Sequence, residues 1–592
     1  MAGVVFHFFA LSAHVHDRLW LCGGANSVAG VATTRETIGF LLLVLCWWGG
    51  AEAGSKIELN GKPYNVPWQQ NDKGQIFIQD HWVRRAVGVT FLSSDRPEQQ
   101  RYQWYGAPTF ANSLFVPPSR LLQIDNIKAD WRTEITGDTL KIFTPDAKVT
   151  EIRRNSTDKG ERITLLLSRP TPWQQSQVGN QLTVTVAAET NNPNSPRLTQ
   201  STDRITQLQI RPAGKETTID LQFNPNLIPQ VRTLSNPPRL VIDLEENFLP
   251  PPQRIAWLPG ITWREEWLAV EGKRWQFYGL EINPQQQGIS FRPIWANQGM
   301  TGTVPLNTIA TVNRAVAAIN GGFFNRDRQL PVSPIKREGV WYSGAVFERG
   351  AVAWNDRHEF TFDRLNYRET ITLPDNQKIN LTNLNSGFVQ KGIARYLPSW
   401  GEYTNLTDNE TIVTVQDNRV VQNITVATSF TQKFLPPPNG YLLVARQVPE
   451  ITTLLAPQTL VKGEVSVRPS AFNQLPHLLG GGPLLLQNGK PVADAHKEGF
   501  SKTFATQAAP RSVIARLKNN NLLLLTLYPN PTLEETTKIL QQLGAVDALN
   551  LDGGSSTGLW LGGTTVDKQG ETRPVHNALA VFYDTNAGKN SF

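Results

Sequence analysis

Apolar and polar residues alternate with a period of two in several short runs between residues 120 and 247. Clear examples are Leu140–Phe143, Leu182–Val186 and Arg239–Leu244. This period places alternate side chains on opposite faces of a strand, and many short runs of this kind are typical of an all-β sandwich. Nearer the N-terminus, Asn60-Gly61 lies between alternating residues and predicts a tight hairpin. We therefore expect a small β module over residues 54–118 and a β domain over residues 119–247.

The pattern changes in the last 330 residues, where helical and strand periods are mixed. Apolar residues at Ile309, Val312, Val316 and Ile319 have the 3-4-3 spacing of an amphipathic helix. Residues 522–527 form an apolar run typical of a buried strand. A capping box at 532–535 opens a helix that Gly544 ends, and residues 548–551 give a second strand. Strand, helix and strand in this order predict a parallel pair with a right-handed crossover.

These elements predict a multidomain protein with an all-β N-terminal part and an α+β C-terminal domain built on a mixed sheet. Consecutive prolines at 250–252 indicate a stiff linker, because proline-rich segments are extended. The expected organisation is a leader at 1–53, the small β module at 54–118 and the β domain at 119–247, followed by a Pro-rich linker at 248–257, the main domain at 258–585 and a tail at 586–592.

Composition narrows the class of protein. The chain has 592 residues, 18% of them charged, a formal net charge of +7 and two cysteines. Two cysteines cannot cross-link a chain of this length, so a disulfide scaffold is excluded. Basic residues form no concentrated run, which argues against a nucleic-acid partner.

The N-terminus has the order of a secretory signal. Arg35 precedes an apolar run at 38–48, and Ala51 and Ala53 give the small residues of a cleavage site. The run is shorter than the roughly 20 residues that a membrane span needs. We expect cleavage before Gly54 and export to a bacterial periplasm or extracellular space, with no membrane segment left. An uncut N-terminal anchor is the alternative.

Glycine pairs beside polar residues occur at 320–325, 479–486 and 550–560. Glycine allows close approach of the backbone and can leave amide N–H groups free to bind anions. Asp552 directly follows a predicted strand, where α/β sheets tend to place ligands. We expect the three loops to form one cleft.

Six ordered blocks carry a more specific signal: AINGGFFN, RYLPSWGEYT, HLLGGGPLLLQNGK, APRSVIA, LGAVDALNLDGGSSTGLW and RPVHNALAVF. Together they resemble the phosphodiester glycosidase family, over roughly residues 258–585. The resemblance implies hydrolysis of the bond between a sugar's anomeric carbon and a phosphodiester oxygen. Two departures from the family, Ser555 in place of a third glycine and Tyr528-Pro529 in place of Asp-Gly, bear on substrate preference. The residues carried over as catalytic are Asp552, Arg511 and Asn320, and those carried over as substrate-binding are Asn325, Gly481, Gly482, Asn550, Gly553, Gly554, Ser555, Ser556, Arg573 and Asn577.

The segments ERITLLLS and PPRLVIDLEE resemble the AMIN domains of exported cell-wall amidases and secretins. This resemblance implies peptidoglycan as a partner of residues 119–247, in addition to a sugar-phosphodiester glycan as substrate. A plain β-sandwich spacer is the alternative.

The chemistry of the residues agrees with the family. An oxocarbenium-like centre needs a carboxylate, and Asp552 is the candidate. Arg511 or Arg573 is expected to grip the phosphate in bidentate fashion. Either Asp494 or Glu498 is the candidate for a second carboxylate.

The sequence also bears on other classes of protein. The pattern at 554–558 matches a serine-hydrolase elbow, with Asp567 and His576 as partners, but three glycines in the following residues disfavour the helix that this elbow needs. The five histidines after residue 53 are scattered, which disfavours zinc, and no cofactor is expected. A divalent ion with oxygen ligands near Asp552 stays open. The remaining alternative is a non-catalytic envelope protein that binds peptidoglycan or another glycan.

Overall fold

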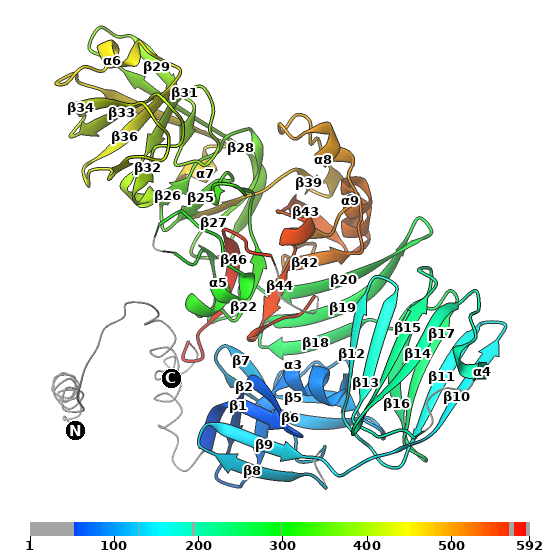
Figure 1. The fold of residues 1–592 in the computed structure, drawn as a ribbon. Helices are drawn as coiled ribbons and strands as arrows, with labels where there is room; N and C mark the ends of the chain where they lie inside the picture. The colour runs from blue at the N-terminus through cyan, green and yellow to red at the C-terminus, as the bar shows by residue number, and fades with distance from the viewer. Residues whose placement is uncertain (1–51, 128–129, 192–195, 298, 568–572, 588–592) are drawn as a thin grey trace, which may run out of the picture.

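The computed structural model describes residues 52–127, 130–191, 196–297, 299–567 and 573–587. The apolar run of the predicted signal sequence and both cysteines lie outside these residues, whereas Glu52 and Ala53 of the predicted cleavage site lie in strand β1. Within them, no helix has the length and apolar character that a membrane span requires. Figure 1 shows a chain built mostly from strands, with the N-terminal β elements below and the C-terminal domain above.

The first module, residues 52–143, is built on one sheet with the order β4-β5-β6-β7-β3-β2-β1-β9-β8. A short helix, α3, and a π-helical turn, η1, follow β3. The bounds are β1 Glu52–Leu59, β2 Lys62–Gln70, β3 Ile76–Gln79, α3 Asp80–Trp82, η1 Val83–Val87, β4 Thr90–Phe91, β5 Gln99–Gln103, β6 Thr109–Val116, β7 Ser119–Gln123, β8 Arg132–Thr136 and β9 Thr139–Phe143.

The predicted hairpin is confirmed, because Leu59 pairs with Lys62 across Asn60 and Gly61, both of which have positive φ. The predicted boundary at 118/119 differs from the structure. Strands β7, β8 and β9 belong to the first sheet, since β7 pairs with β3 and β6 while β9 runs parallel to β1. Alternation along a strand gives its period but does not identify the sheet that it joins.

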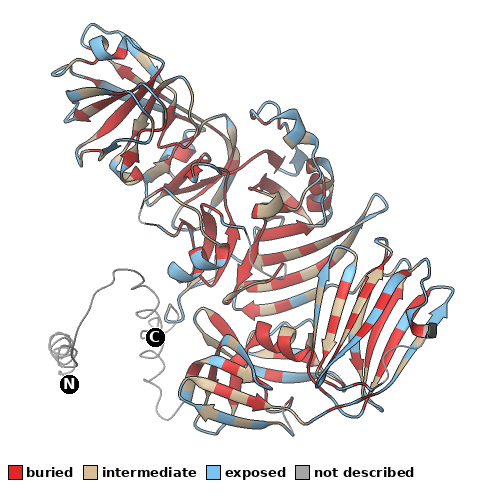
Figure 2. Ribbon diagram, in the orientation of Figure 1, coloured by how far each residue is buried: buried red, intermediate tan, exposed pale blue. Residues whose placement is uncertain are grey.

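The sandwich, residues 149–245, confirms the predicted all-β fold of this region. Its two sheets have the orders β10-β11-β17-β16 and β12-β13-β15-β14, and a separate hydrophobic core lies between them. Buried and exposed residues alternate along its strands in Figure 2. The bounds are β10 Val149–Thr157, β11 Gly160–Leu167, β12 Trp173–Val178, β13 Gln181–Val186, α4 Pro196–Thr199, β14 Ile205–Ala213, β15 Glu216–Phe223, β16 Ile228–Leu234 and β17 Arg239–Glu245.

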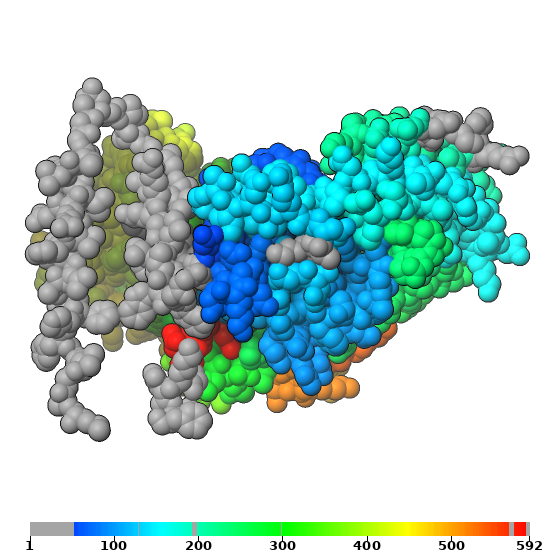
Figure 3. Space-filling model, turned by 90° about the horizontal axis from the view of Figure 1, so that it is seen from below, coloured from blue at the N-terminus to red at the C-terminus, as the bar shows by residue number. Residues whose placement is uncertain are grey.

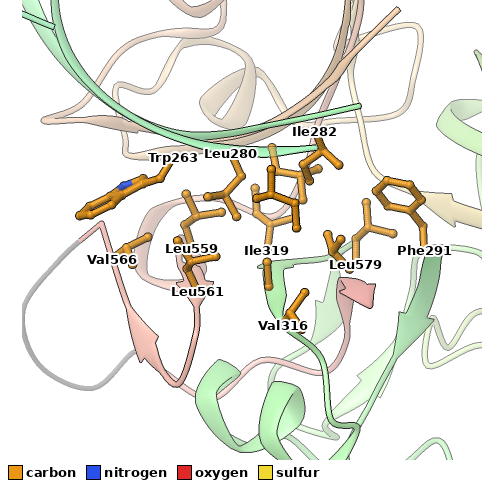
Figure 4. Close-up of a cluster of buried hydrophobic side chains, with 14 of the residues drawn as sticks. Trp263, Leu280, Ile282, Phe291, Val316, Ile319, Leu559, Leu561, Val566 and Leu579 are labelled. Atoms are coloured by element: carbon orange, nitrogen blue, oxygen red, sulfur yellow. The ribbon is translucent and has the colours of Figure 1, made fainter. Parts of the chain in front are cut away.

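The C-terminal domain, residues 253–583, begins inside the predicted linker. Residues 253–258 are strand β18, which pairs with β19, because the segment after the prolines alternates apolar and polar residues. A long antiparallel sheet with the order β18-β19-β20-β42-β41-β43-β39-β40 faces a second sheet, β21-β46-β22-β44-β45. Figure 4 shows the core between these two sheets, where Trp263 and Leu280 meet Leu559 and Leu561.

Two larger sheets and two two-stranded ones, β23-β24 and β32-β35, complete this domain among the described residues. One of the larger sheets has the order β26-β25-β38-β27-β28-β29, with β37 also paired to β28. The other, β30-β31-β36-β33-β34, is mixed because β30 and β31 run parallel, and it forms the upper-left lobe in Figure 1. The domain is thus a mixed-sheet domain with few helices, as the fold class predicts.

The elements of this domain have the following bounds: β18 Gln253–Leu258, β19 Ile261–Val270, β20 Lys273–Ile282, β21 Ile289–Ile294, α5 Leu306–Val312, β22 Ala317–Asn320, β23 Phe324–Asn325, β24 Leu330–Pro331, β25 Ile335–Arg337, β26 Val340–Ser343, β27 Arg349–Trp354, β28 Phe360–Thr372, β29 Lys378–Leu381, β30 Asn383–Leu384, β31 Gly392–Tyr396, η2 Pro398–Trp400, β32 Tyr403–Thr404, β33 Glu410–Gln416, β34 Arg419–Val426, β35 Lys433–Phe434, β36 Gly440–Arg446, α6 Ile451–Leu454, β37 Lys462–Arg468, α7 Ala471–Gln474, β38 His477–Gly480, β39 Leu484–Gln487, β40 Lys490–Pro491, α8 Lys502–Thr506, β41 Arg511–Leu517, β42 Leu522–Tyr528, α9 Leu533–Gln542, β43 Ala545–Asn550, η3 Gly554–Ser556, β44 Leu559–Leu561, β45 Thr564–Thr565 and β46 Ala578–Tyr583.

Two local predictions here are corrected. The helix expected at 309–319 ends at Val312, which is exposed, and residues 317–320 form β22 in the core. An alanine- and valine-rich run fits a buried strand as well as a helix, so the spacing of apolar residues alone does not distinguish the two. The predicted helix α9 and its capping box are confirmed. However, β42 and β43 are not adjacent, because β41 lies between them and is antiparallel to both.

The first module and the C-terminal domain pack into one body. One hydrophobic core runs through both, from Ile57 and Trp82 to Trp257 and Leu561. At their boundary Gln79 Nε2 and Ser119 Oγ both donate to the carbonyl of Gly562, at 2.7 and 2.8 Å. In Figure 3 the first module, in blue, lies against both the sandwich and the C-terminal domain.

Candidate functional site

The three glycine-pair loops converge, as predicted. A Cβ atom on Gly322 would lie 2.3 Å from the carbonyl oxygen of Gly480, and one on Gly481 would lie 2.4 Å from that of Asn550. Only glycine allows the backbones to approach this closely. The loops after β22, β38 and β43 are therefore packed directly on one another, and Asp552 lies where they meet.

The amide groups of these glycines do not line a cleft as expected. Gly481 donates its N–H to Gly350 O, Gly482 to Asn550 O and Gly554 to Pro510 O, at 2.7–3.0 Å. These N–H groups hold the loops together and are not directed at a ligand. Gly553 differs, because its N–H bonds to the Asp552 carboxylate.

Asp552 is the candidate reactive group of the site. Its side chain is 9% exposed, and burial raises its pKa to about 6, against the opposing effects of a hydrogen bond from Ser556 and the charge of Arg326. A carboxyl group with such a pKa changes its charge near neutral pH, which is the property that catalytic carboxylates are tuned to have. Its backbone N–H donates to Gly321 O, so the first loop fixes its position.

Asn320 holds the backbone of Asp552 in place. Its Nδ2 donates to the carbonyl of Asp552 at 2.6 Å, and its Oδ1 accepts from Ser512 Oγ and from the N–H of Gly558. The side chain is fully buried and all its polar atoms are used. The side chain thus holds the loop that carries Asp552, and the catalytic role of Asn320 stays a prediction.

Asn550 and Asn577 have similar positioning roles. Asn550 Nδ2 donates to Gly482 O at 2.7 Å, and Asn577 Oδ1 accepts from the N–H of Gly322 at 2.9 Å. Both side chains are buried. They hold the second and first loops, respectively, beside the Asp552 loop.

Arg511 is buried, with 1% of its surface exposed, and burial lowers its pKa to about 10. Its Nε donates to Pro531 O at 3.0 Å and its Nη2 donates to Gln507 O at 2.5 Å. Among the described residues, Nη1 has no hydrogen-bond partner. A bidentate grip through Nε and Nη2 is therefore excluded in this arrangement, and Arg511 has one terminal nitrogen to offer an anion.

The cation that acts on Asp552 is Arg326, which the sequence analysis missed. It is exposed and directly follows Asn325, whose side chain bonds to the N–H of Arg328. Its place immediately after the NGGFFN block was the signal available in the sequence. Ser512, which directs Asn320, was also missed, although it follows Arg511.

The remaining predicted residues differ in how far they are buried. Ser555 is half-buried, Ser556 is buried against Asp552, and Arg573 is exposed. Glu498 is unsuited as a second carboxylate, because it pairs with Arg364 at 2.8 Å and accepts the N–H groups of Gly350 and Leu484. Asp494 is exposed and caps a turn through the N–H of Lys497.

The serine-hydrolase alternative is not assembled in the structure. His576 Nε2 bonds to Met300 O at 2.8 Å, Asp567 accepts from Tyr528 Oη at 2.7 Å, and Ser556 bonds to Asp552. Among the described residues, no three His, Cys, Asp or Glu side chains are grouped so that they could hold a metal ion.

One of the six sequence blocks is structural. Tyr396 and Tyr403, from the RYLPSWGEYT block, hydrogen-bond to Arg446, which forms a buried ion pair with Glu410. This network lies in the core of the upper-left lobe. The block therefore identifies the fold and contributes no group to the site.

Comparison with known proteins identifies two domains. The phosphodiester glycosidase family matches residues 409–582, and the AMIN domain matches residues 207–257. The AMIN match covers the second half of the sandwich and reaches into β18, ten residues beyond the predicted boundary. The glycosidase match includes the Asp552 loop and Arg511, while the loop that carries Asn320 lies before it. No curated protein matches the chain.

Solved structures add a relative. A hypothetical protein from Synechocystis is 37% identical, with a TM-score of 0.81, and the match covers 90% of this chain and 99% of that one. A protein from Burkholderia pseudomallei K96243 is 14% identical, with a TM-score of 0.45 and coverages of 76% and 99%. The catalytic domain of zebrafish N-acetylglucosamine-1-phosphodiester alpha-N-acetylglucosaminidase, described as auto-inhibited by its pro-peptide, is 12% identical, with a TM-score of 0.28 and coverages of 57% and 90%.

The last two similarities are too weak to bear on this chain, whereas the Synechocystis protein shares nearly its whole length. The chain therefore belongs to the same family as the Synechocystis protein, and it contains a phosphodiester glycosidase domain and an AMIN domain.

Proposed function

We propose that the protein is an exported glycosidase that hydrolyses the bond between a sugar's anomeric carbon and a phosphodiester in a cell-envelope or extracellular glycan. The observation that carries the proposal is Asp552, a buried carboxyl group with a pKa of about 6 at the meeting point of three loops. The family match supplies the reaction class.

In this proposal Asp552, when ionised, faces the anomeric carbon and stabilises or attacks the developing positive charge. Arg326 is exposed beside it and faces the phosphate, and Nη1 of Arg511 offers a further donor. The C1–O bond breaks, water supplies the new oxygen at C1, and the phosphate leaves with the bonding electrons. A phosphate is a good leaving group, so the reaction does not need Glu498, which is already paired.

The AMIN domain supports envelope association. We infer that the sandwich binds peptidoglycan and takes no part in turnover, because the loops that hold Asp552 all belong to the C-terminal domain. Export to a bacterial periplasm or extracellular space is part of the same proposal.

The test is hydrolysis of a panel of sugar-1-phosphate methyl diesters by residues 54–592, followed as release of reducing sugar. We expect turnover of at least one member, lost in Asp552→Asn and retained in Asp494→Asn, the exposed carboxylate that serves as control. Binding of glycans without turnover of any panel member would instead favour the non-catalytic alternative.

A further inference from the structure

A cluster of phenylalanines lies beside the candidate site and has no role in the reaction proposed above. The phenylalanine cluster consists of Phe323, Phe347, Phe388, Phe500 and Phe504. Phe500 and Phe504 are stacked with ring centroids 4.4 Å apart, and Phe323 meets both edge-on at 5.3 and 5.7 Å. Phe347 and Phe388 form a second pair at 5.3 Å.

The cluster is continuous with the loops that hold Asp552. Phe323 directly follows Gly322 of the first loop, and Gly482 of the second loop lies so close to Phe500 that a Cβ atom would be 2.9 Å from its ring. The Arg511 guanidinium lies 6.0 Å from the centre of the Phe504 ring. A ligand group attached to a phosphate near Arg511 would therefore reach the rings directly.

The cluster is open on one side. Phe347 is 38% exposed and Phe500 only 8%, while the other three rings are partly buried. Helix α8, which carries Phe504, has no buried residue, and Lys502, Thr503 and Thr506 are exposed (Figure 2). Partly exposed apolar surface beside a site is a candidate place for an apolar part of a ligand.

The polar groups around the rings are largely engaged. The Arg349 guanidinium lies 3.9 Å from the centre of the Phe500 ring and 4.9 Å from that of Phe347, and its Nε and Nη2 donate to Glu498 O and Gly499 O. The Glu498 carboxylate is turned to Arg364. Phenylalanine itself offers no donor or acceptor, so a second sugar placed here would lose hydration of its hydroxyls without gaining partners. An apolar chain would have no such cost.

Resting on the proposed function, we propose that the phenylalanine cluster binds an apolar aglycone, so that the substrate is a glycosyl phosphodiester whose second ester group is a long alkyl or prenyl chain. The phosphate lies at the Arg511 end and the chain extends over the rings towards Phe347 and Phe388. Hydrolysis at C1 yields the free sugar, with its new oxygen from water, and the chain as its phosphate monoester.

The experiment compares the methyl, hexyl and decyl diesters of one sugar 1-phosphate, each below its micelle concentration, with the full mature chain. Burial of a methylene gives up to about a fourfold gain in affinity. We expect kcat/KM to rise about two- to fourfold per methylene over the first several carbons. The double variant Phe347→Ser, Phe388→Ser should lower the rate on the decyl diester to within about tenfold of the methyl diester and leave the methyl diester rate unchanged.

Phe110→Ser is the matched control, because Phe110 is 54% exposed on strand β6 of the first module. It should change neither rate. Equal rates on methyl and decyl diesters, an advantage that survives in the double variant, or a gain from a second sugar in place of the chain would each overturn the inference while leaving the glycosidase proposal standing.

If no diester is cleaved, binding of decyl phosphate and methyl phosphate by calorimetry decides the question. Tighter binding of decyl phosphate that the double variant abolishes supports the subsite even though the proposed function has failed. Equal binding of the two phosphates overturns the subsite as well.

Discussion

The first module and the sandwich are both all-β, with similar alternation along their strands, but they relate to the C-terminal domain in opposite ways. The sandwich encloses its own core. The first module shares its core with the C-terminal domain, and Asp80 at their boundary accepts hydrogen bonds from Trp257 and Arg120. A region whose alternating residues predict a β domain therefore does not always fold as an independent unit.

The contacts of the sandwich with the first module are few by comparison. Tyr105 donates its N–H to Thr233 Oγ1 and its hydroxyl to Thr171 O. Gly88 packs against the ring of Trp173. Among the described residues, Tyr105 is the one buried residue that the first module supplies to the sandwich core, so we expect loss of the sandwich to leave the rest of the molecule folded.

The largest predicted effect comes from deletion. A chain that starts at Pro252 loses the first module, exposes the core around Trp257, and should be insoluble or unfolded by circular dichroism. A chain in which a Gly/Ser linker of about 15 residues replaces 147–249 should fold and keep hydrolysis of small diesters; such a linker reaches roughly 20 Å. A soluble, active fragment 252–592 would contradict the comparison.

The next effect concerns buried ion pairs in the two regions. Asp80→Asn leaves Arg120, which is 1% exposed, without a carboxylate partner and should cost about 3–5 kcal/mol. Glu161→Gln in the sandwich removes the partner of Arg154 and is the matched variant. We expect calorimetry to show that Asp80→Asn lowers the transition of the C-terminal domain, while Glu161→Gln lowers only a sandwich transition. If Asp80→Asn left the unfolding temperature of the C-terminal domain unchanged, the first module and that domain would unfold independently, against the prediction.

Asp552→Asn should lower kcat about 10²–10³-fold and leave peptidoglycan binding by the sandwich unchanged. The pKa of Asp552 is raised to about 6, so its ionisation costs stability as pH rises from about 4 through 6. The neutral asparagine avoids this cost. The variant should therefore be more stable than the wild type at pH 8, on the order of 1–3 kcal/mol, and nearly equal at pH 4. Normal turnover in a folded Asp552→Asn protein would make the residue a turn cap only.

The smallest effect tests the orientation of the sandwich. Tyr105→Phe removes the buried hydrogen bond to Thr171 O and should cost about 1 kcal/mol. Cleavage of small diesters should not change, since the ring stays in place and the loops that hold Asp552 all belong to the C-terminal domain. A drop in small-substrate turnover would show that the position of the sandwich matters to the site.

Local signals in the sequence predicted local structure well. The Asn60-Gly61 hairpin and the α9 capping box depend on backbone geometry within four residues, and both are present. Which strands pair with one another was harder to predict from the sequence. Nothing in the alternation of 119–143 distinguishes the sheet of the first module from the sandwich, and β41 separates two strands that consecutive order made neighbours.

The same division holds for the candidate site. The glycine pairs predicted that three loops meet, because close backbone approach requires glycine at those positions. They did not reveal that most of the amides face each other, since a hydrogen-bond partner is a property of the assembled loops. Arg326 was missed for a related reason: an exposed arginine becomes significant only when its distance to a buried carboxylate is known.

The pairing of Ser94 with Ile255 has a consequence for how such a protein can change over time. It joins the first module directly to β18, so the sandwich leaves and re-enters a body that is otherwise continuous. Topologically the sandwich is an insertion. The free-energy cost of closing the loop between the first module and β18 rises only with the logarithm of the loop length, by about 0.6 kcal/mol for each doubling. A lineage can therefore exchange, duplicate or discard the sandwich without rebuilding the loops that hold Asp552.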